Sequence, residues 1–233
     1  MLTLAVDTSG LTASCAAVED GKVVAEVSTK HGKTHSQKIL PMIKTTLSML
    51  DRDMKDVDLF AASIGPGSFT GLRIGVVTIK GLAYSLKKPA YGVPTLDALA
   101  YSMPDFNGII SPMLDARNNQ VFTAFYQKLN GKMEKLGQDS GITIKEWIDK
   151  AGEFNKDIMI LGDAADIHLP MLKEIFGNKI FCPQLAMTFP RASATALLAE
   201  EAFHSNNVIT AYELEPFYLR KSQAERLKNS QKK

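Results

Sequence analysis

The chain has 233 residues, enough for one large domain or for two smaller domains that each bury a core. Hydrophobic residues make up 45% of it and charged residues 22%, a composition that argues against a disordered, fibrous or membrane protein. Because 27 basic side chains are balanced by 25 acidic ones, the formal charge is only +2, and no general attraction to nucleic acid is expected.

The cysteine pattern and the N-terminus favour a cytoplasmic protein. Cys15 and Cys182 lie far apart and form no Cys-x-x-Cys motif, which is typical of a reducing compartment and argues against a structural zinc site. The N-terminus lacks the basic region and the cleavage motif of a signal peptide. The most apolar stretch, residues 69–86, is interrupted by Arg73 and Lys80, so it predicts a helix and not a membrane span.

The first hundred residues predict a three-stranded antiparallel meander followed by alternating helices and strands. The Asp20-Gly21 pair is a strong hairpin signal between the second and third strands. Expected strands cover residues 2–7, 13–19, 22–28, 59–64 and 90–93, and expected helices cover residues 36–50, 69–86 and 95–101.

Beyond residue 103 the same order of elements begins again. The Met103-Pro104 pair begins a structure-breaking segment and is the best candidate for a domain boundary. Expected strands cover residues 109–115, 120–129, 133–137, 158–161 and 179–182, and expected helices cover residues 144–151, 165–176 and 193–204. We therefore expect two related α/β lobes, at residues 1–103 and 104–210, with a basic C-terminal segment at 211–233 that returns towards the first lobe.

Two long helices carry more apolar surface than an ordinary surface helix. Apolar side chains cover about half of helix 36–50 and nearly all of helix 69–86, whose charges recur every seven residues on one narrow stripe. Gly71 and Gly75 lie one turn apart and allow a neighbouring element to approach closely. The helices are covered either by their own lobe alone or also by a partner subunit, and the pattern does not separate these interpretations.

A glycine-rich loop joins the strand at 59–64 to the second long helix. It reads Gly-Pro-Gly-Ser-Phe-Thr-Gly-Leu-Arg-Ile-Gly from Gly65 to Gly75. A loop between a strand and a helix N-terminus has the geometry that binds phosphate. The residues, however, match neither the Walker A loop nor the dinucleotide fingerprint. Ser68 fits a helix cap equally well.

Residue by residue, the sequence of this loop resembles the hallmark motif of the bacterial TsaB (YeaZ) family. Further segments resemble that family at residues 4–9, 35–41, 112–117 and 216–220. The chain departs from the usual family pattern after Arg117 and at Gly162-Asp163, both in the second lobe.

The resemblance implies an actin/Hsp70-like (ASKHA) fold of two lobes, each a mixed sheet with flanking helices. It implies a non-catalytic dimerisation subunit of the machinery that installs threonylcarbamoyl on adenosine 37 of tRNA (t6A). The implied partners are the catalytic subunit TsaD, the ATPase TsaE and, functionally, a TsaC-type enzyme, with a homodimer when the chain is alone. No cofactor is expected for the chain itself, although ATP or ADP at a subunit interface is compatible with this role.

The two long helices are the interface that the resemblance implies. Ten of their residues are the expected partner contacts: His35, Ile39, Met42, Ile43, Leu72, Arg73, Val76, Ile79, Lys80 and Ala83.

The alternative function is an ASKHA-type nucleotide-binding ATPase or kinase-like enzyme. Asp7 and Ser9, with Gly67 and Ser68, would then be the remnants of two phosphate loops. Enzymes of this class need a second acidic loop, usually Asp-x-Gly, but the corresponding segment is Asp-Ala-Arg at 115–117. Nucleotide binding without turnover is therefore the most that these residues predict.

Other candidate sites are weaker. His31 and His35 are spaced like metal ligands, but no third ligand is evident and no metal site is expected. Ser68 lacks a partner histidine and the nucleophile-elbow pattern of a peptidase. Several cations of the C-terminal segment offer indirect or weak contacts to tRNA phosphates: Arg220, Lys221, Arg226, Lys228, Lys232 and Lys233.

Overall fold

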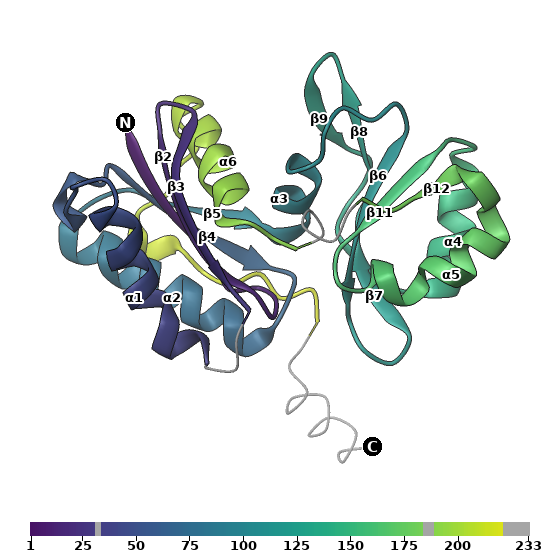
Figure 1. Ribbon diagram of the computed structural model, residues 1–233, viewed down its shortest axis with the longest axis horizontal. Coiled ribbons are helices and arrows are strands. Elements are labelled where there is room, and N and C mark those ends of the chain that lie inside the picture. Colours follow the sequence, from purple (N-terminus) through teal and green to yellow (C-terminus); the bar gives the residue numbers. More distant parts are fainter. Residues whose placement is uncertain (31–33, 184–188, 221–233) are drawn as a thin grey trace.

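The computed structural model describes residues 1–30, 34–183 and 189–220, which form two α/β lobes side by side (Figure 1). The sheet of the first lobe has the order β3-β2-β1-β4-β5, in which β1, β4 and β5 run parallel and the meander pairs antiparallel. Its strands are β1 (Leu2–Asp7), β2 (Ala13–Glu19), β3 (Lys22–Thr29), β4 (Leu59–Gly65) and β5 (Ala90–Pro94).

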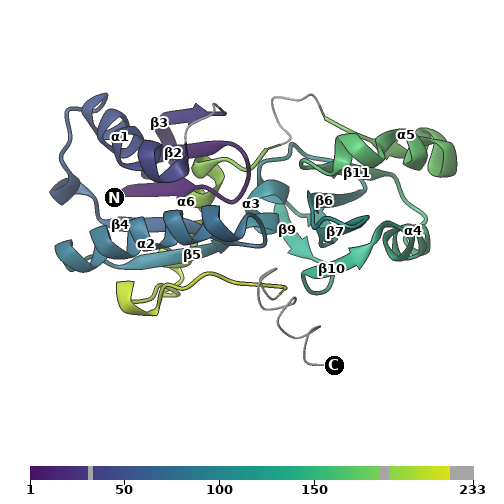
Figure 2. The same ribbon diagram turned by 90° about the horizontal axis from the view of Figure 1, so that it is seen from below.

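Helices cover both faces of this sheet. On one face lie α1 (His35–Ser48) and α2 (Phe69–Leu86), and on the other lies α6 (Ala192–His204), as Figure 1 shows. The short helix α3 (Thr95–Tyr101) lies between the lobes (Figure 2). Single 3-10 turns occur at Met54–Asp56 and Ala211–Glu213. All six side chains of β1 are buried, which a strand requires when helices pack on both of its faces.

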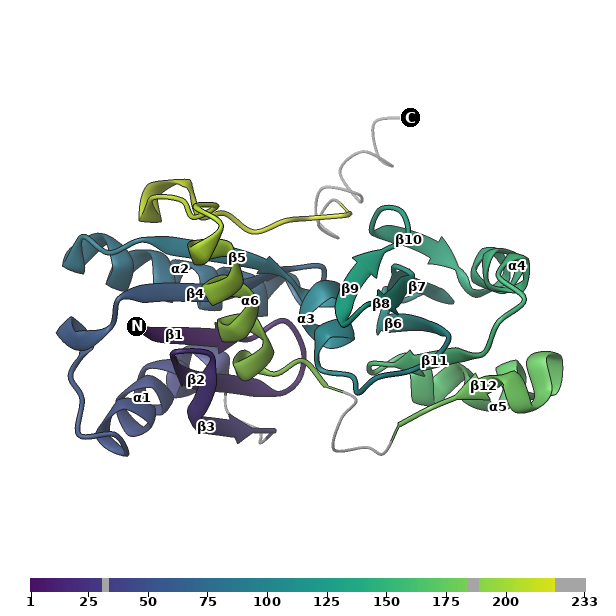
Figure 3. The same cartoon turned by 90° about the horizontal axis from the view of Figure 1, so that it is seen from above.

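The position of α6 corrects the expected boundary of the second lobe at residue 210. Alanines of α6 pack on Ala5, Ala16 and Ala61 of the first sheet, and small side chains on both sides let the helix approach closely. Buried polar contacts add to this packing, because Thr3 Oγ1 donates to Glu200 Oε1 at 3.0 Å. Figure 3 shows α6 over the first sheet. Residues 192–204 therefore belong to the first lobe.

The second sheet has the order β10-β7-β6-β11-β12, with the β8–β9 hairpin attached to β6. On its outer face lie α4 (Ile144–Glu153) and α5 (Ala165–Phe176), and α3 packs on its inner face. The strands are β6 (Ile109–Asp115), β7 (Gln120–Thr123), β8 (Tyr126–Leu129), β9 (Lys132–Lys135), β10 (Ser140–Thr143), β11 (Ile158–Leu161) and β12 (Ile180–Phe181), and a 3-10 turn occurs at Gly177–Lys179.

The single strand expected at residues 120–129 is wrong. Ala124, Phe125 and Tyr126 are all buried, which breaks the in-out alternation of a strand. Both β7 and β8 pair with β6 on one edge. On the opposite edge β7 pairs with β10 and β8 pairs with β9, so the two strands have different neighbours. The sequence analysis missed β10 because its four residues carry too short an apolar pattern.

The two long helices are only partly covered. The seven apolar residues expected at a partner interface are buried in the first lobe's own core: Ile39, Met42, Ile43, Leu72, Val76, Ile79 and Ala83. Their assignment as partner contacts is wrong in this conformation, because the most apolar side of each helix faces the sheet. Other apolar side chains remain outside, with Val77 65% and Tyr84 70% exposed. None of the described helices is long and apolar enough to cross a membrane.

Candidate functional site at the interlobe cleft

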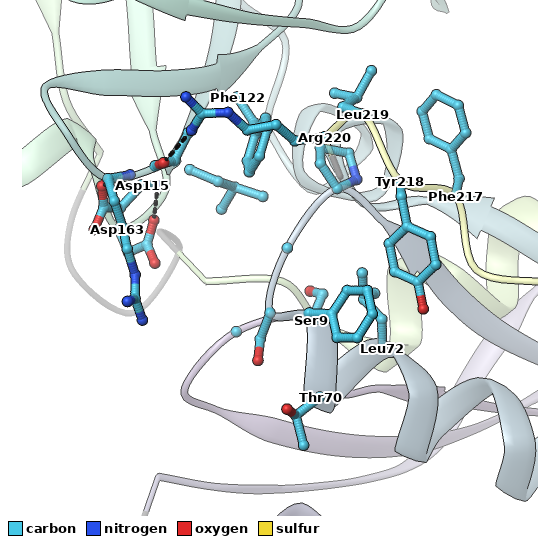
Figure 4. A pocket seen from close by; sticks show the side chains of 18 of the residues that line it. Ser9, Thr70, Leu72, Asp115, Phe122, Asp163, Phe217, Tyr218, Leu219 and Arg220 are labelled. Atoms are coloured by element: carbon cyan, nitrogen blue, oxygen red, sulfur yellow. Dashed lines mark hydrogen bonds between the residues drawn. The ribbon is translucent and has the colours of Figure 1, made fainter. Parts of the chain in front are cut away.

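A cleft of about 560 Å³ lies between the lobes (Figure 4). The first lobe contributes the loop after β1 and the glycine-rich loop, the second lobe contributes the turn after β6, and residues 217–220 close one side. Its polar lining includes Ser9, Ser68, Asp115, Arg117, Asp163 and Arg220.

The glycine-rich loop packs directly on the loop after β1. Ser68 N donates to Ser9 O at 2.7 Å, and a Cβ on Gly67 would lie 2.4 Å from the same oxygen, so only glycine fits there. Ser68 Oγ accepts a hydrogen bond from Gly71 N at 3.2 Å, which confirms its role as the N-cap of α2. Three of the four residues expected to bind a nucleotide, Ser9, Gly67 and Ser68, therefore line the cleft.

The fourth, Asp7, does not line the cleft, and its assignment as a cofactor contact is wrong. It is fully buried, and its Oδ1 accepts from Ser9 N at 2.9 Å and Ser9 Oγ at 2.7 Å. Its Oδ2 accepts from Ser63 Oγ. Burial raises the pKa of Asp7, although the hydrogen bonds from Ser63 and Ser9 oppose this shift. Asp7 therefore holds the Ser9 loop and presents no free oxygen to a phosphate-bound metal ion.

On the second lobe, two carboxylates are engaged by backbone groups. Asp163 Oδ1 accepts from Asp115 N at 2.9 Å, and Asp115 Oδ1 accepts from Arg117 N at 2.7 Å. Burial raises the pKa of Asp163, and the charge of Asp115 adds to the shift, while backbone hydrogen bonds oppose it. These contacts fix a turn in which Arg117 has a left-handed φ of 62°. The carboxylates therefore support the turn that borders the cleft.

Residues 211–220, which we call the strap, lie along α2 of the first lobe, towards which the C-terminal segment was expected to return, although the sequence did not indicate α2 as the contact. Lys80 Nζ donates to Tyr212 O at 2.7 Å and to Leu214 O at 3.1 Å. Arg73 Nε donates to Tyr218 OH at 3.0 Å. The expected partner contacts Arg73 and Lys80 thus bind the chain's own strap, and their role in a partner interface stays a prediction.

Arg220 at the end of the strap reaches the second lobe. Its Nη1 donates to Ala116 O at 2.8 Å, and its Nη2 donates to Gln120 Oε1. Figure 4 shows the arginine extending across the cleft towards Asp115 and Asp163. The other expected tRNA-contacting cations, at positions 221–233, lie outside the described residues.

His35 also lies at the cleft and not on an outer helix face. One ring nitrogen, Nε2, is 2.9 Å from Gly10 O, so the residue contacts the loop after β1, and its contact with a partner stays a prediction. His31 lies outside the described residues. Within residues 1–30, 34–183 and 189–220, no group of three His, Cys, Asp or Glu side chains is placed to hold a metal ion.

In comparisons with known proteins, the chain is similar to proteins named TsaD and TsaB. The family model described as TsaD, tRNA N6-adenosine threonylcarbamoyltransferase, matches residues 22–228. The TsaB protein of Bacillus subtilis, named a tRNA threonylcarbamoyladenosine biosynthesis protein, is 35% identical over 225 residues, which cover 97% of this chain and 96% of the relative. The Escherichia coli protein of the same name is 29% identical over 229 residues, with 96% of each chain covered.

Solved structures show the same fold. YeaZ from Pseudomonas aeruginosa superposes with a TM-score of 0.75 at 23% identity, over 94% of this chain and 99% of that one. A protein described as similar to peptidase YeaZ from the same organism gives 0.79 at 24% identity, with the same coverage. The expected fold of two α/β lobes, each a mixed sheet with flanking helices, is confirmed. From its sequence and its fold, the chain belongs to the TsaB (YeaZ) family.

Proposed function

We propose that the chain is a non-catalytic subunit of the machinery that makes t6A in tRNA, and that it binds and activates a TsaD-type catalytic subunit. Its curated relatives carry the name of that pathway, and it matches the TsaD family model over residues 22–228. The observation that supports a non-catalytic role most strongly is Asp7. In an ATP-using relative of this fold a carboxylate here would face the phosphates, whereas both Asp7 oxygens are occupied inside the protein.

The docking surface that we propose is the exposed face of α2. Arg73, Val77, Gly81 and Tyr84 follow one another at helical spacing on the side turned away from the sheet, and all four are exposed. Large exposed apolar side chains on such a face favour a protein interface. Leu40 on the neighbouring α1, also exposed, extends this face.

Reconstitution of t6A synthesis tests this proposal. The reaction contains TsaD, TsaE, a TsaC-type enzyme, tRNA, threonine, bicarbonate and ATP. Val77→Glu should reduce modification to the level without the chain, because a charge would be buried against the partner. Ile167→Glu is the matched control, since Ile167 is also 65% exposed but lies on α5 of the second lobe. Undiminished modification with folded Val77→Glu would refute the proposed surface.

The alternative, an ATP-hydrolysing or kinase-like enzyme, draws support from Ser9 and the N-terminus of α2 at the cleft. We expect the isolated chain to release no phosphate from ATP above the buffer background. Turnover that disappears in Ser9→Ala would favour the enzyme and contradict the proposed role. Ser9 replaces Asp7 in this test because removing a buried carboxylate would disturb the fold itself.

The remaining assignments follow from the proposed role. We propose that the chain acts in the cytoplasm, pairs with itself when TsaD is absent, and needs no cofactor of its own. TsaE and the TsaC-type enzyme are functional partners in the same reaction sequence. Contacts with tRNA are indirect or weak, consistent with a formal charge of only +2.

A further inference from the structure

The strap is fastened to the first lobe along its length. At one end Lys80 binds the carbonyls of Tyr212 and Leu214. Further on, Phe217 N donates to Ile64 O at 2.8 Å, and the Tyr218 ring stacks on Phe69 with centroids 4.7 Å apart. Figures 2 and 3 show the strap running along the first lobe towards the second.

The backbone of the strap packs closely on the first lobe. A Cβ on Gly65 would lie 2.4 Å from Phe217 O, so the strap occupies the space that a side chain there would need. The Arg73 guanidinium lies 4.1 Å from the centroid of the Phe69 ring and also binds Tyr218 OH. Hydrogen bonds, ring stacking and close backbone packing therefore act on the same short segment.

Within the described residues 211–220, Arg220 is the residue whose side chain forms hydrogen bonds with the second lobe. Its guanidinium donates to Ala116 O and Gln120 Oε1, on both sides of the turn between β6 and β7. Hydrogen bonds from a charged donor are stronger than those between neutral groups. Partial burial strengthens them further, because the local dielectric constant is lower than in water. Arg220 thus joins the lobes across the cleft that it lines.

A second attachment between the lobes lies at α3. Leu96 and Leu99 of this helix pack with Ile110 and Leu161 of the second sheet. Asp97 Oδ1 accepts from Tyr126 OH at 2.6 Å and from Lys135 Nζ at 2.7 Å. The apolar part of this contact is non-directional and tolerates a small rotation of the lobes, whereas the Arg220 hydrogen bonds depend on distance and angle.

We propose that the strap is an interlobe latch: Arg220 holds the cleft at a fixed opening, and its release lets the lobes rotate about α3. The chain thereby sets its interlobe angle with its own C-terminal segment and needs no ligand in the cleft to do so. The latch is independent of the proposed role in t6A synthesis, because it concerns the isolated chain.

Spin labels on the two lobes test the latch. Lys44→Cys on α1 and Lys145→Cys on α4 place labels at exposed positions, in a Cys182→Ser background. Burial raises the pKa of the Cys15 thiol to about 12, so Cys15 does not react with the label. Pulsed electron–electron resonance of the full chain should give one narrow distance distribution. Arg220→Gln should raise the population outside that peak by at least about tenfold, because the loss of one charge-assisted hydrogen bond at the weak end of the usual range already has that effect.

Arg52→Gln is the matched control, because Arg52 pairs with Glu19 on the surface of the first lobe. It should leave the distance distribution unchanged. If Arg220→Gln gives the same distribution as this control, the latch is refuted. Should Arg220→Gln fail to fold by circular dichroism, Gln120→Ala, which removes one acceptor, is judged by the same criterion.

Discussion

At the scale of single residues, two glycines of α2 let this helix approach the loop after β1 closely. A Cβ on Gly71 would lie 2.0 Å from Thr8 O, and one on Gly75 would lie 2.4 Å from Thr8 Oγ1. Thr8 Oγ1 also donates to Gly71 O at 2.7 Å. The sequence predicted that these glycines permit a close approach, but the neighbour was not readable, because spacing along one helix carries no information about what faces it.

Alanine substitutions test this contact. Gly71→Ala should lower the free energy of unfolding by about 2 kcal/mol, because the new methyl group collides with backbone that cannot move freely. Gly81→Ala is the matched control, since its Cβ would meet nothing within 4 Å. This control should gain about 0.5–1 kcal/mol from helix propensity. Urea denaturation measures both values, and equal effects at the two positions would contradict the packing described.

The buried carboxylate of Asp7 predicts a pH dependence. Its pKa in the folded state is raised above the ordinary value of 3.8 by burial. The folded protein therefore holds this proton more tightly than the unfolded chain, and the contribution of Asp7 to stability falls as pH rises through the window above 3.8. Asp7→Asn lacks this loss, so its stability relative to wild type should improve from about pH 4 to pH 7. A constant or declining difference in denaturation experiments would contradict the assignment.

At the scale of elements, local signals decided which boundaries were predictable. The bounds of α2, residues 69–86, follow from the Ser68 cap at one end and from a left-handed Lys87 at the other. The split of residues 120–129 was not predictable, because the neighbours of β7 and β8 are set by the sheet and not by their own residues. The prediction that α6 belongs to the second lobe was wrong for the same reason. It followed the order of the chain, whereas the position of α6 is set by the sheet on which it packs.

Glu200 tests the placement of α6 in the first lobe. Its Oε1 accepts from Thr3 Oγ1, and its Oε2 accepts from Gly21 N at 2.7 Å, so one buried carboxylate ties α6 to β1 and to the β2–β3 turn. Glu200→Ala should lower the free energy of unfolding by about 2 kcal/mol, because the buried hydroxyl of Thr3 and the partly buried amide of Gly21 lose their acceptor. Hydrogen exchange should speed up in the first lobe before the second. The exposed Glu174→Ala on α5 should change stability by less than about 0.5 kcal/mol. Faster exchange confined to the second lobe would refute the placement.

At the scale of the whole molecule, the two lobes were predictable and the cleft between them was only partly so. The repeated order of strands and helices, with the family resemblance, predicted the lobes. Ser9, Gly67 and Ser68, which were expected to be remnants of phosphate loops, line the cleft because their loops lie at the same edge of one sheet, and nucleotide binding by them stays a prediction. The position of Arg220 at the cleft was not predictable from the sequence. Its partners at positions 116 and 120 are about a hundred residues away along the chain and come close only in the folded protein.

The packing of α2 in the whole molecule explains why its buried residues were wrongly predicted as partner contacts. A helix that is apolar nearly all round has a covered side and an open side, and its sequence does not say which is which. The covered side holds Val76 and Ile79, whose substitution by acidic residues would disrupt the core and mimic a loss of binding. The open side holds Val77 and Tyr84, where the same change leaves the core intact.

The most direct test of the proposed role is the affinity of the folded chain for a TsaD-type catalytic subunit, measured by isothermal titration calorimetry. The double variant Val77→Glu, Tyr84→Glu should bind at least about a hundredfold more weakly than wild type, as expected for central interface residues. Ile167→Glu should bind like wild type. An unchanged affinity of the double variant, with its circular dichroism and thermal transition preserved, would show that the exposed face of α2 is not the docking surface.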